Sequence, residues 1–191
     1  MKKINLLLLI LFVTKLYAQL PSPAMVGYWE AWDYNTKLVT LDQIDDRYNV
    51  ICIAFAQYNG GKDYDVKFTP PKNYTEQEFK DGVKALQDQG KKVLISLGGE
   101  TTPHVLDNAN EKDVFVSSMN TMIDYWGFDG LDIDLEGGSV HYTDINIEAP
   151  GDVTQQLFIE ALREILDNHQ SSHNEKLLLT MAPETMYVQG A

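Results

Sequence analysis

Four carboxylic acids lie within eight residues near the middle of the chain, in the segment FDGLDIDLE at 128–136. From Leu131 to Glu136, aliphatic and acidic residues alternate strictly, which is typical of a β-strand with two chemically different faces. Asp132, Asp134 and Glu136 are expected on one face, with successive side chains about 6.6 Å apart. Mutual repulsion should raise the pKa of at least one of them. The spacing therefore predicts a catalytic strand.

An ordinary half-solvated strand can also alternate acidic and aliphatic residues. Two features favour catalysis: Asp and Glu are poor strand formers, and glycines bracket the run at Gly130 and at 137–138. Asp129 is out of phase with the other three acids. We therefore expect Asp129 to fix the turn that leads into the strand rather than to touch a substrate.

The N-terminus has the pattern of a secretory signal. Two lysines precede an apolar run over 6–13, and the small residue Ala18 follows at a suitable distance. The run is too short to span a bilayer, and a buried N-terminal helix is disfavoured by the basic start and by Pro21 and Pro23. Residues 1–18 are predicted to be removed, which gives a secreted protein, extracellular or periplasmic, with no membrane attachment.

The balance of charged residues is strongly acidic. The formal net charge is −13, and loss of Lys2, Lys3 and Lys15 with the signal makes it −16. Such a chain is repelled by nucleic acid and by anionic membranes, so a neutral or cationic substrate suits it better. The single cysteine, Cys52, lies in an apolar run, so we expect a small buried hydrophobic side chain and no intrachain disulfide.

Strand and helix patterns alternate along the chain, which predicts right-handed crossovers and a parallel α/β sheet. Apolar, β-branched or alternating runs predict strands, and capped amphipathic runs predict helices. A long polar stretch, 57–73, is expected to be a functional loop. The expected strands are 25–30, 49–56, 92–97, 131–136 and 176–182, and the expected helices are 41–48 (weak), 75–90, 111–125 and 153–169.

The acidic run resembles the D-x-x-D-x-D-x-E signature of glycoside hydrolase family 18, the chitinases and related endo-β-N-acetylglucosaminidases. Four further segments occur in the order known from that family, namely Gly27-Tyr-Trp, Ile53-Ala-Phe-Ala56, Ser96-x-Gly-Gly99 and Met181-Ala-Pro-Glu184. The resemblance implies a (β/α)8 TIM barrel over 19–191. We expect no cofactor and no metal ion, and we expect the protein to be a monomer.

Such a barrel has about 250 residues, whereas only five of its eight strands can be counted here. We therefore expect an incomplete barrel, the N-terminal portion of an enzyme. The tyrosine expected on strand six and the tryptophan expected at the base of the pocket have no counterparts. Strands one and five would then lack a neighbour, and the 191-residue chain alone is expected to be inactive.

The resemblance assigns roles to the acid row. Glu136 is the general acid that protonates the glycosidic oxygen. The 2-acetamido oxygen of the sugar attacks its own C1, which is the substrate-assisted exception to the two-carboxylate scheme. Asp134 orients the acetamide and stabilises the positive charge, and Asp132 shares a proton with Asp134 and helps to keep Glu136 protonated.

Four other residues are candidates for the site, each with an alternative interpretation. Ser96 is expected to donate to the acid row, or else it belongs to the turn before two glycines. Tyr28 is expected to point inward and to reach the acids with its hydroxyl, or else it is a core tyrosine. Phe55 is expected to pack beneath the site rather than to bind sugar. Met181 is expected to line the sugar pocket, or else it is a core methionine.

Two further groups of side chains are of types that can bind sugars or metal ions. Trp29 and Trp32 could stack on sugars or merely bury apolar area. His169 and His173 have the i, i+4 spacing of a metal pair, but they lie at a helix end and no acid lies at ligand spacing in the sequence. We therefore expect surface histidines that complement the helix dipole, and no metal site.

The predicted function is a secreted, endo-acting chitinase whose partner is chitin or N-acetylglucosamine oligosaccharides. One alternative is an endo-β-N-acetylglucosaminidase that cleaves N-glycan cores. The other is a chitin-binding lectin, a class in which family members usually lack the acid found here as Glu136.

Overall fold

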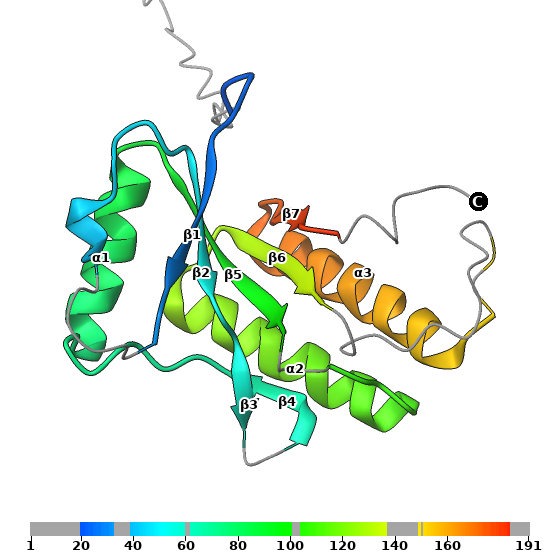
Figure 1. The fold of residues 1–191 in the computed structure, drawn as a ribbon. Helices are drawn as coiled ribbons and strands as arrows, with labels where there is room; N and C mark the ends of the chain where they lie inside the picture. Colours follow the sequence, from blue (N-terminus) through cyan, green and yellow to red (C-terminus); the bar gives the residue numbers. More distant parts are fainter. Residues whose placement is uncertain are drawn as a thin grey trace, which may run out of the picture.

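The computed structural model describes residues 20–32, 39–59, 62–100, 104–136, 149 and 151–183. The predicted signal peptide, Gly137, Gly138, Glu184 and the segment 188–190 lie outside these ranges. The central feature is a parallel five-stranded sheet in the order β1-β2-β5-β6-β7 (Figure 1). Its strands are β1 (Val26–Glu30), β2 (Val50–Ala54), β5 (Lys92–Gly99), β6 (Gly130–Leu135) and β7 (Leu178–Met181).

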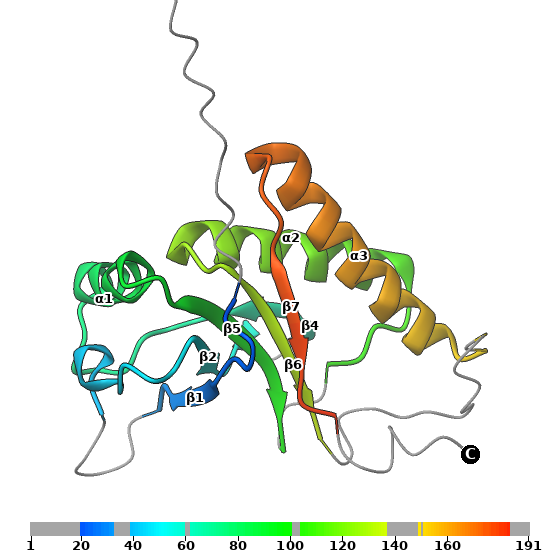
Figure 2. The same cartoon turned by 90° about the horizontal axis from the view of Figure 1, so that it is seen from above.

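Each strand of this sheet pairs in parallel with the strand that follows it around the sheet. Three helices return the chain: α1 (Glu76–Asp88), α2 (Ala109–Trp126) and α3 (Val153–His173). Figure 2 shows all three on the same side of a curved sheet. This arrangement is an incomplete (β/α)8 barrel with five strands, as the sequence predicted.

The helices cover the aliphatic face of the sheet. Alternate residues of the buried strands join helix side chains in one hydrophobic core, including Ile53, Ile95 and Ile133 from the sheet. Full burial of one such side chain stabilises the fold by about 1.5–3 kcal/mol. Because side chains alternate along a strand, this packing leaves the opposite face of the same strands for the acid row.

The helix ends follow the sequence signals. Thr75 Oγ1 accepts a hydrogen bond from the Glu78 backbone nitrogen at 3.2 Å, and the Glu78 carboxylate accepts from the Thr75 nitrogen at 2.7 Å. Asp152 caps α3 by accepting from the Thr154 nitrogen at 2.9 Å. Gly127 ends α2 with a φ of 73°, a left-handed conformation that favours glycine.

Two sequence-based expectations were wrong. The expected helix over 41–48 is only one 3₁₀ turn, η1 (Leu41–Gln43), which docks Leu41 into the core. The expected loop over 57–73 contains an antiparallel hairpin, β3 (Gln57–Asn59) and β4 (Lys62–Lys67). Val66 is buried against α2, and its backbone nitrogen donates to Ser118 Oγ at 3.2 Å. Tertiary packing therefore orders a polar stretch with few apolar residues of its own.

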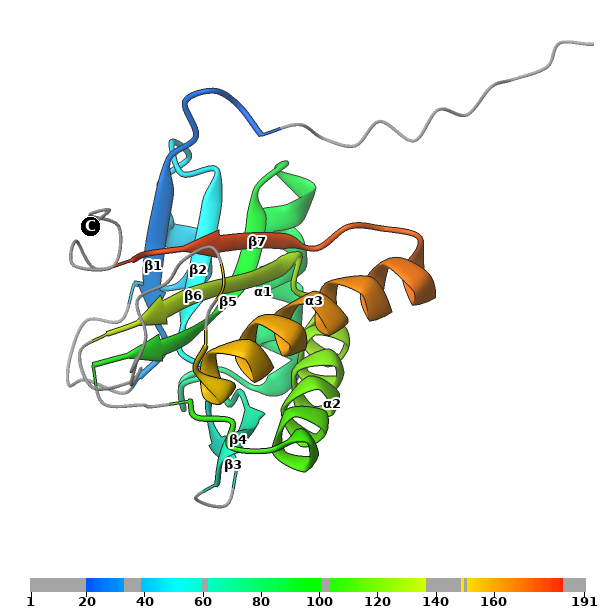
Figure 3. The ribbon, with the colours of Figure 1, turned by 90° about the vertical axis from the view of Figure 1, so that its right-hand side faces the viewer.

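The two outer strands differ from the three inner ones. Among the described residues, β1 pairs only with β2, and β7 pairs only with β6. Val26, Tyr28, Leu179 and Met181 on these strands are exposed, whereas β2 is buried throughout. Figure 3 shows the two outer strands and the helices from the side. No helix within the described ranges is both long and apolar enough to cross a lipid bilayer.

Candidate active site

The acid row lies on β6 and on the residue that follows it. Leu131 and Ile133 are buried in the core against the helices. Asp132, Asp134 and Glu136 therefore project from the opposite face. Asp132 is 2% exposed, whereas Asp134 and Glu136, toward the carboxyl end of the strand, are half-buried. Active sites of such barrels form at this end, so the row runs from the interior to the mouth of the barrel.

Three hydroxyl groups hold the carboxylate of Asp132. Oδ2 accepts from the Tyr28 hydroxyl at 2.7 Å and from Ser96 Oγ at 2.8 Å, and Oδ1 accepts from Thr180 Oγ1 at 2.5 Å. These donors come from β1, β5 and β7, so one buried carboxylate connects four of the five strands. Hydrogen bonds to an ionised group offset much of the cost of burying it.

Asp134 has a different environment. Burial raises its pKa to about 6, and the nearby charges of Glu136 and then Asp132 act in the same direction. This confirms the expectation that repulsion within the row raises at least one pKa, although burial is the larger cause. A carboxyl group with a pKa of about 6 exchanges its proton easily near neutral pH, which suits acid–base chemistry.

Close backbone packing places the acid strand beside β5. Gly98 pairs with Asp134 across the sheet, and a Cβ added at Gly98 would lie 2.2 Å from the backbone oxygen of Asp134. Its φ of 124° is also a conformation that favours glycine. The glycine therefore allows β5 to approach β6 at the level of Asp134.

Tyr28 and Ser96 reach the acid row, as expected from the sequence. Burial and the hydrogen bond to Asp132 both raise the pKa of the Tyr28 hydroxyl, which therefore remains a proton donor. Thr180 and the position of Cys52 beside Tyr28 were not predicted from the sequence. Cys52 pairs with Tyr28 in the sheet, and burial, then the Asp132 charge, raise the pKa of its thiol to about 12. The lone hydroxyl of Thr180 in an apolar strand was the available signal.

Asp129 lies at the other end of the strand. It accepts from Gln87 Nε2 at 2.9 Å, from Lys92 Nζ at 2.7 Å and from the Val93 nitrogen at 2.9 Å. Six residues of strand lie between it and Glu136, and the seven steps of about 3.3 Å span about 23 Å. Asp129 therefore fixes the start of β6 against β5 and α1, in agreement with the role expected for it.

Aromatic side chains follow the carboxyl ends of β1 and β2. The Phe55 and Trp32 rings stack with centroids 5.8 Å apart and planes 13° apart. Phe55 also lies against Gly99, where an added Cβ would approach its ring to 3.0 Å. Trp29 instead is buried in the core and donates from Nε1 to the Val39 oxygen at 2.7 Å. Of the two tryptophans, Trp29 therefore serves the core.

Met181 is not brought to the acid row. It pairs with Ile133, and Thr180 beside it faces Asp132. Alternation along the strand therefore directs Met181 to the aliphatic face, where it is exposed. The expected place of Met181 in the sugar pocket is not supported by this register.

Metal-ligating side chains gather elsewhere. Within the described part of the chain, the group that could hold a metal ion is Asp124, His169 and His173, on α2 and α3. No acid lies at ligand spacing from these histidines in the sequence, because Asp124 comes from another helix, 45 residues before His169. Short-range spacing in the sequence could not show this contact.

A parallel barrel sheet with a row of carboxylates at the carboxyl end of one strand is the architecture of a TIM-barrel glycoside hydrolase. The family model of the glycosyl hydrolases family 18 matches residues 24–190. The chain belongs to this family.

Known members of the family are similar to most of this chain. Chitinase Chi52 of Paenibacillus xylanexedens is 35% identical over 168 residues, which are 87% of this chain and 31% of that protein. Exochitinase 1 of Streptomyces olivaceoviridis is 36% identical over 181 residues, 90% of this chain and 30% of that protein. A family 18 chitinase from Chromobacterium violaceum has a TM-score of 0.71 at 33% identity, over 87% of this chain and 42% of that one. The chain thus spans less than half of each.

Proposed function

We propose that the protein is a chitinase that hydrolyses β-1,4 linkages between N-acetylglucosamine units, with retention of configuration at the anomeric carbon. The observation that supports this most is the difference in environment along the acid row. Three hydroxyl groups fix Asp132, whereas Asp134, beside Glu136, has a pKa of about 6. The similarity to proteins named as chitinases supports the choice of substrate.

Glu136 is the proposed general acid. It gives its proton to the glycosidic oxygen while the bond from that oxygen to C1 breaks. The acetamido oxygen of the same sugar forms a new bond to C1, which gives a cyclic oxazolinium ion. The resulting Glu136 carboxylate then takes a proton from water as the water oxygen attacks C1. The bond from C1 to the acetamido oxygen breaks in the same step, which restores the acetamide and returns the enzyme to its starting state.

Asp134 is the proposed partner of the acetamide. An ionised Asp134 accepts a hydrogen bond from the N–H of the acetamido group and stabilises the positive charge that forms on the ring. Because its pKa is about 6, the group can also hold a proton between turnovers. Asp132, held by Tyr28, Ser96 and Thr180, is positioned to repel a second negative charge on Asp134.

The test is hydrolysis of chitin hexamer by the full-length natural protein that contains this chain, followed by NMR of the first products. Shorter oligomers with the β anomer in excess are expected, and Glu136→Gln should slow their formation by a factor of roughly 10²–10⁴. Products from internal bonds would establish endo action, whereas only dimers from one end would establish exo action.

Two results would overturn the proposal. Cleavage of N-glycan cores with no attack on chitin would favour an endo-β-N-acetylglucosaminidase. Chitin binding that is equal in the natural protein and in Glu136→Gln, with no turnover in either, would favour a lectin.

We also propose secretion, which rests on the N-terminal pattern of residues 1–18. The protein recovered outside the producing cells should begin at Gln19 when its N-terminus is sequenced. Retention of Met1 in a protein that stays inside the cell would contradict this.

A further inference from the structure

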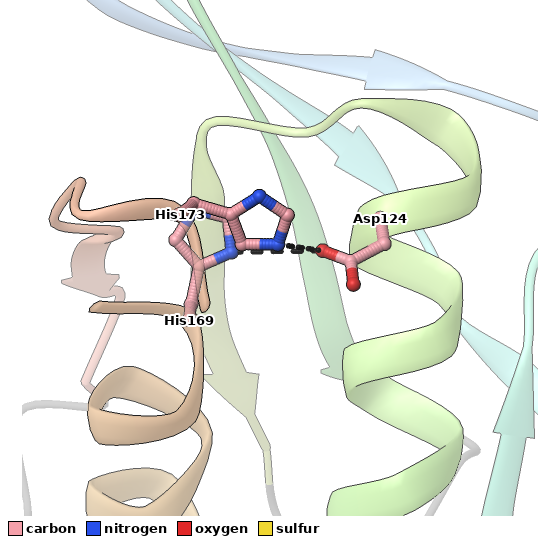
Figure 4. A group of neighbouring side chains, drawn as sticks. All are labelled: Asp124, His169 and His173. Carbon is pink, nitrogen blue, oxygen red and sulfur yellow. Dashed lines mark ion pairs between the residues drawn. The ribbon is translucent and has the colours of Figure 1, made fainter. Parts of the chain in front are cut away.

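Two histidines of α3 and one aspartate of α2 meet at the C-terminal ends of the two helices. His173 Nε2 lies 3.1 Å and His169 Nδ1 3.6 Å from the same oxygen, Asp124 Oδ1. Figure 4 shows both imidazole rings reaching from α3 toward Asp124 on α2. The acid row faces away from these helices, so the group is separate from the proposed active site.

These distances suit a metal ion. All three donor atoms lie within 4.8 Å of one another. Zinc binds nitrogen and carboxylate oxygen at about 2.0–2.1 Å in tetrahedral geometry, so two ligands of one ion are separated by about 3.3 Å. The separations of 3.1 and 3.6 Å from Asp124 Oδ1 fall on either side of that value. Two imidazoles and one carboxylate also form a donor set that favours zinc over magnesium and calcium.

Helix geometry orients the ligands in advance. The spacing of four residues puts His169 and His173 on the same side of α3, and their rings stack with centroids 4.3 Å apart. The His169 side chain is only 14% exposed, whereas those of His173 and Asp124 are 42% and 48% exposed. One ligand is therefore held by packing, while the outer two leave an approach from solvent for the ion and for a water as fourth ligand.

We propose that Asp124, His169 and His173 form a zinc-binding site that ties the C-terminal end of α2 to that of α3. These helix ends lie at the amino ends of the strands, the face of such barrels that serves stability rather than catalysis. An ion bound there joins two elements that are 45 residues apart at the nearest ligands. The proposed role of the ion is to stabilise the fold, because an ion that binds only the folded state favours that state by mass action.

The test is calorimetric titration of the metal-free protein with zinc chloride at pH 7.5, together with cobalt titration followed by visible absorption. One equivalent of zinc should bind, and cobalt should give the intense absorption bands of tetrahedral coordination. Zinc should also raise the melting temperature. Magnesium and calcium at the same concentration should have no such effect.

Three variants locate the ion: Asp124→Asn, His169→Gln and His173→Gln. Each should weaken zinc binding at least tenfold and remove the zinc-dependent rise in melting temperature. Asp113→Asn is the matched control, because it makes the same chemical change at a 69% exposed position of the same helix, and it should bind zinc as the natural chain does. Absence of stoichiometric binding, or equal binding in all variants, would overturn the proposal.

Discussion

Asp132 and Asp134 are the same type of residue, two positions apart on one strand, yet their environments differ. Asp132 is 2% exposed and accepts three hydrogen bonds from hydroxyl groups. Asp134 is half-buried, and burial together with the charges of its neighbours raises its pKa to about 6. We call Asp132 and its three donors the anchored end of the row, and Asp134 with Glu136 the reactive end.

The comparison shows how one strand can combine stability with reactivity. Hydroxyl donors on three other strands make the buried charge part of the framework. After burial and the charge of Glu136, the charge of Asp132 also raises the pKa of Asp134. Fewer interactions compensate this repulsion, so the Asp134 carboxyl group exchanges its proton easily. Substitutions at the anchored end should therefore affect the stability of the fold, and substitutions at the reactive end should affect turnover.

The largest effect is expected for Glu136→Gln at the reactive end. Loss of the transferable proton should lower kcat by a factor of roughly 10²–10⁴, or about 3–5 kcal/mol on the barrier. Steady-state hydrolysis of chitin hexamer by the full-length protein measures this. The melting temperature should stay within about 1 °C of the natural protein, and a large fall in it would show that Glu136 also supports the fold.

At the anchored end, Asp132→Ala should destabilise the fold by about 2–4 kcal/mol. Three hydroxyl groups would lose their acceptor, and the gain from reduced repulsion at Asp134 offsets only part of that cost. Urea denaturation measures the free energy of unfolding. Asp113→Ala, at an exposed position, should change it by less than about 0.5 kcal/mol. Equal effects of the two substitutions would remove the distinction between the two ends.

Asp134→Asn should stabilise the fold at pH 7 while it lowers activity. The folded state binds the Asp134 proton more tightly than the unfolded chain does, so stability falls as pH rises from about 4 to above 6. Asparagine does not titrate, so the variant does not lose stability in this way as pH rises. The gain at pH 7 should be about 1–2 kcal/mol after allowance for solvent screening, and it should vanish at pH 3.5. Denaturation at both pH values would test the sign.

Ser96→Ala should have the smallest effect. One of the two donors to Asp132 Oδ2 disappears while Tyr28 remains, so the fold should lose about 1 kcal/mol and turnover should fall only a few-fold. Ser117→Ala on the exposed side of α2 is the matched control and should change neither quantity. A loss as large as that of Asp132→Ala would mean that Ser96 alone fixes the carboxylate.

Local patterns in the sequence were sufficient for the acid row. Strict alternation placed Asp132, Asp134 and Glu136 on one face, and the phase of Asp129 separated it from them. The roles of these acids in chemistry stay predictions. The lone hydroxyl of Thr180 marks one face of its strand, but the contact of that face with Asp132 depends on the pairing of β7 with β6, which the sequence does not show.

Features that depend on packing between distant elements could not be predicted in this way. Asp124 meets the histidines only because α2 lies beside α3. The β3–β4 hairpin is polar, and its order depends on the contact of Val66 with α2. The face that Met181 shares with Ile133 depends on the register between β7 and β6, which the sequence does not show.

The reactivity of the buried Cys52 thiol can report how often the sheet opens. Its side chain is fully enclosed, and with a pKa of about 12 it carries almost no thiolate at neutral pH. In an unfolded chain the pKa returns to about 8.5, which raises the thiolate population by a factor of roughly a thousand or more. Since the sequence has one cysteine, the rate of labelling by a thiol reagent follows how often the sheet opens at the anchored end.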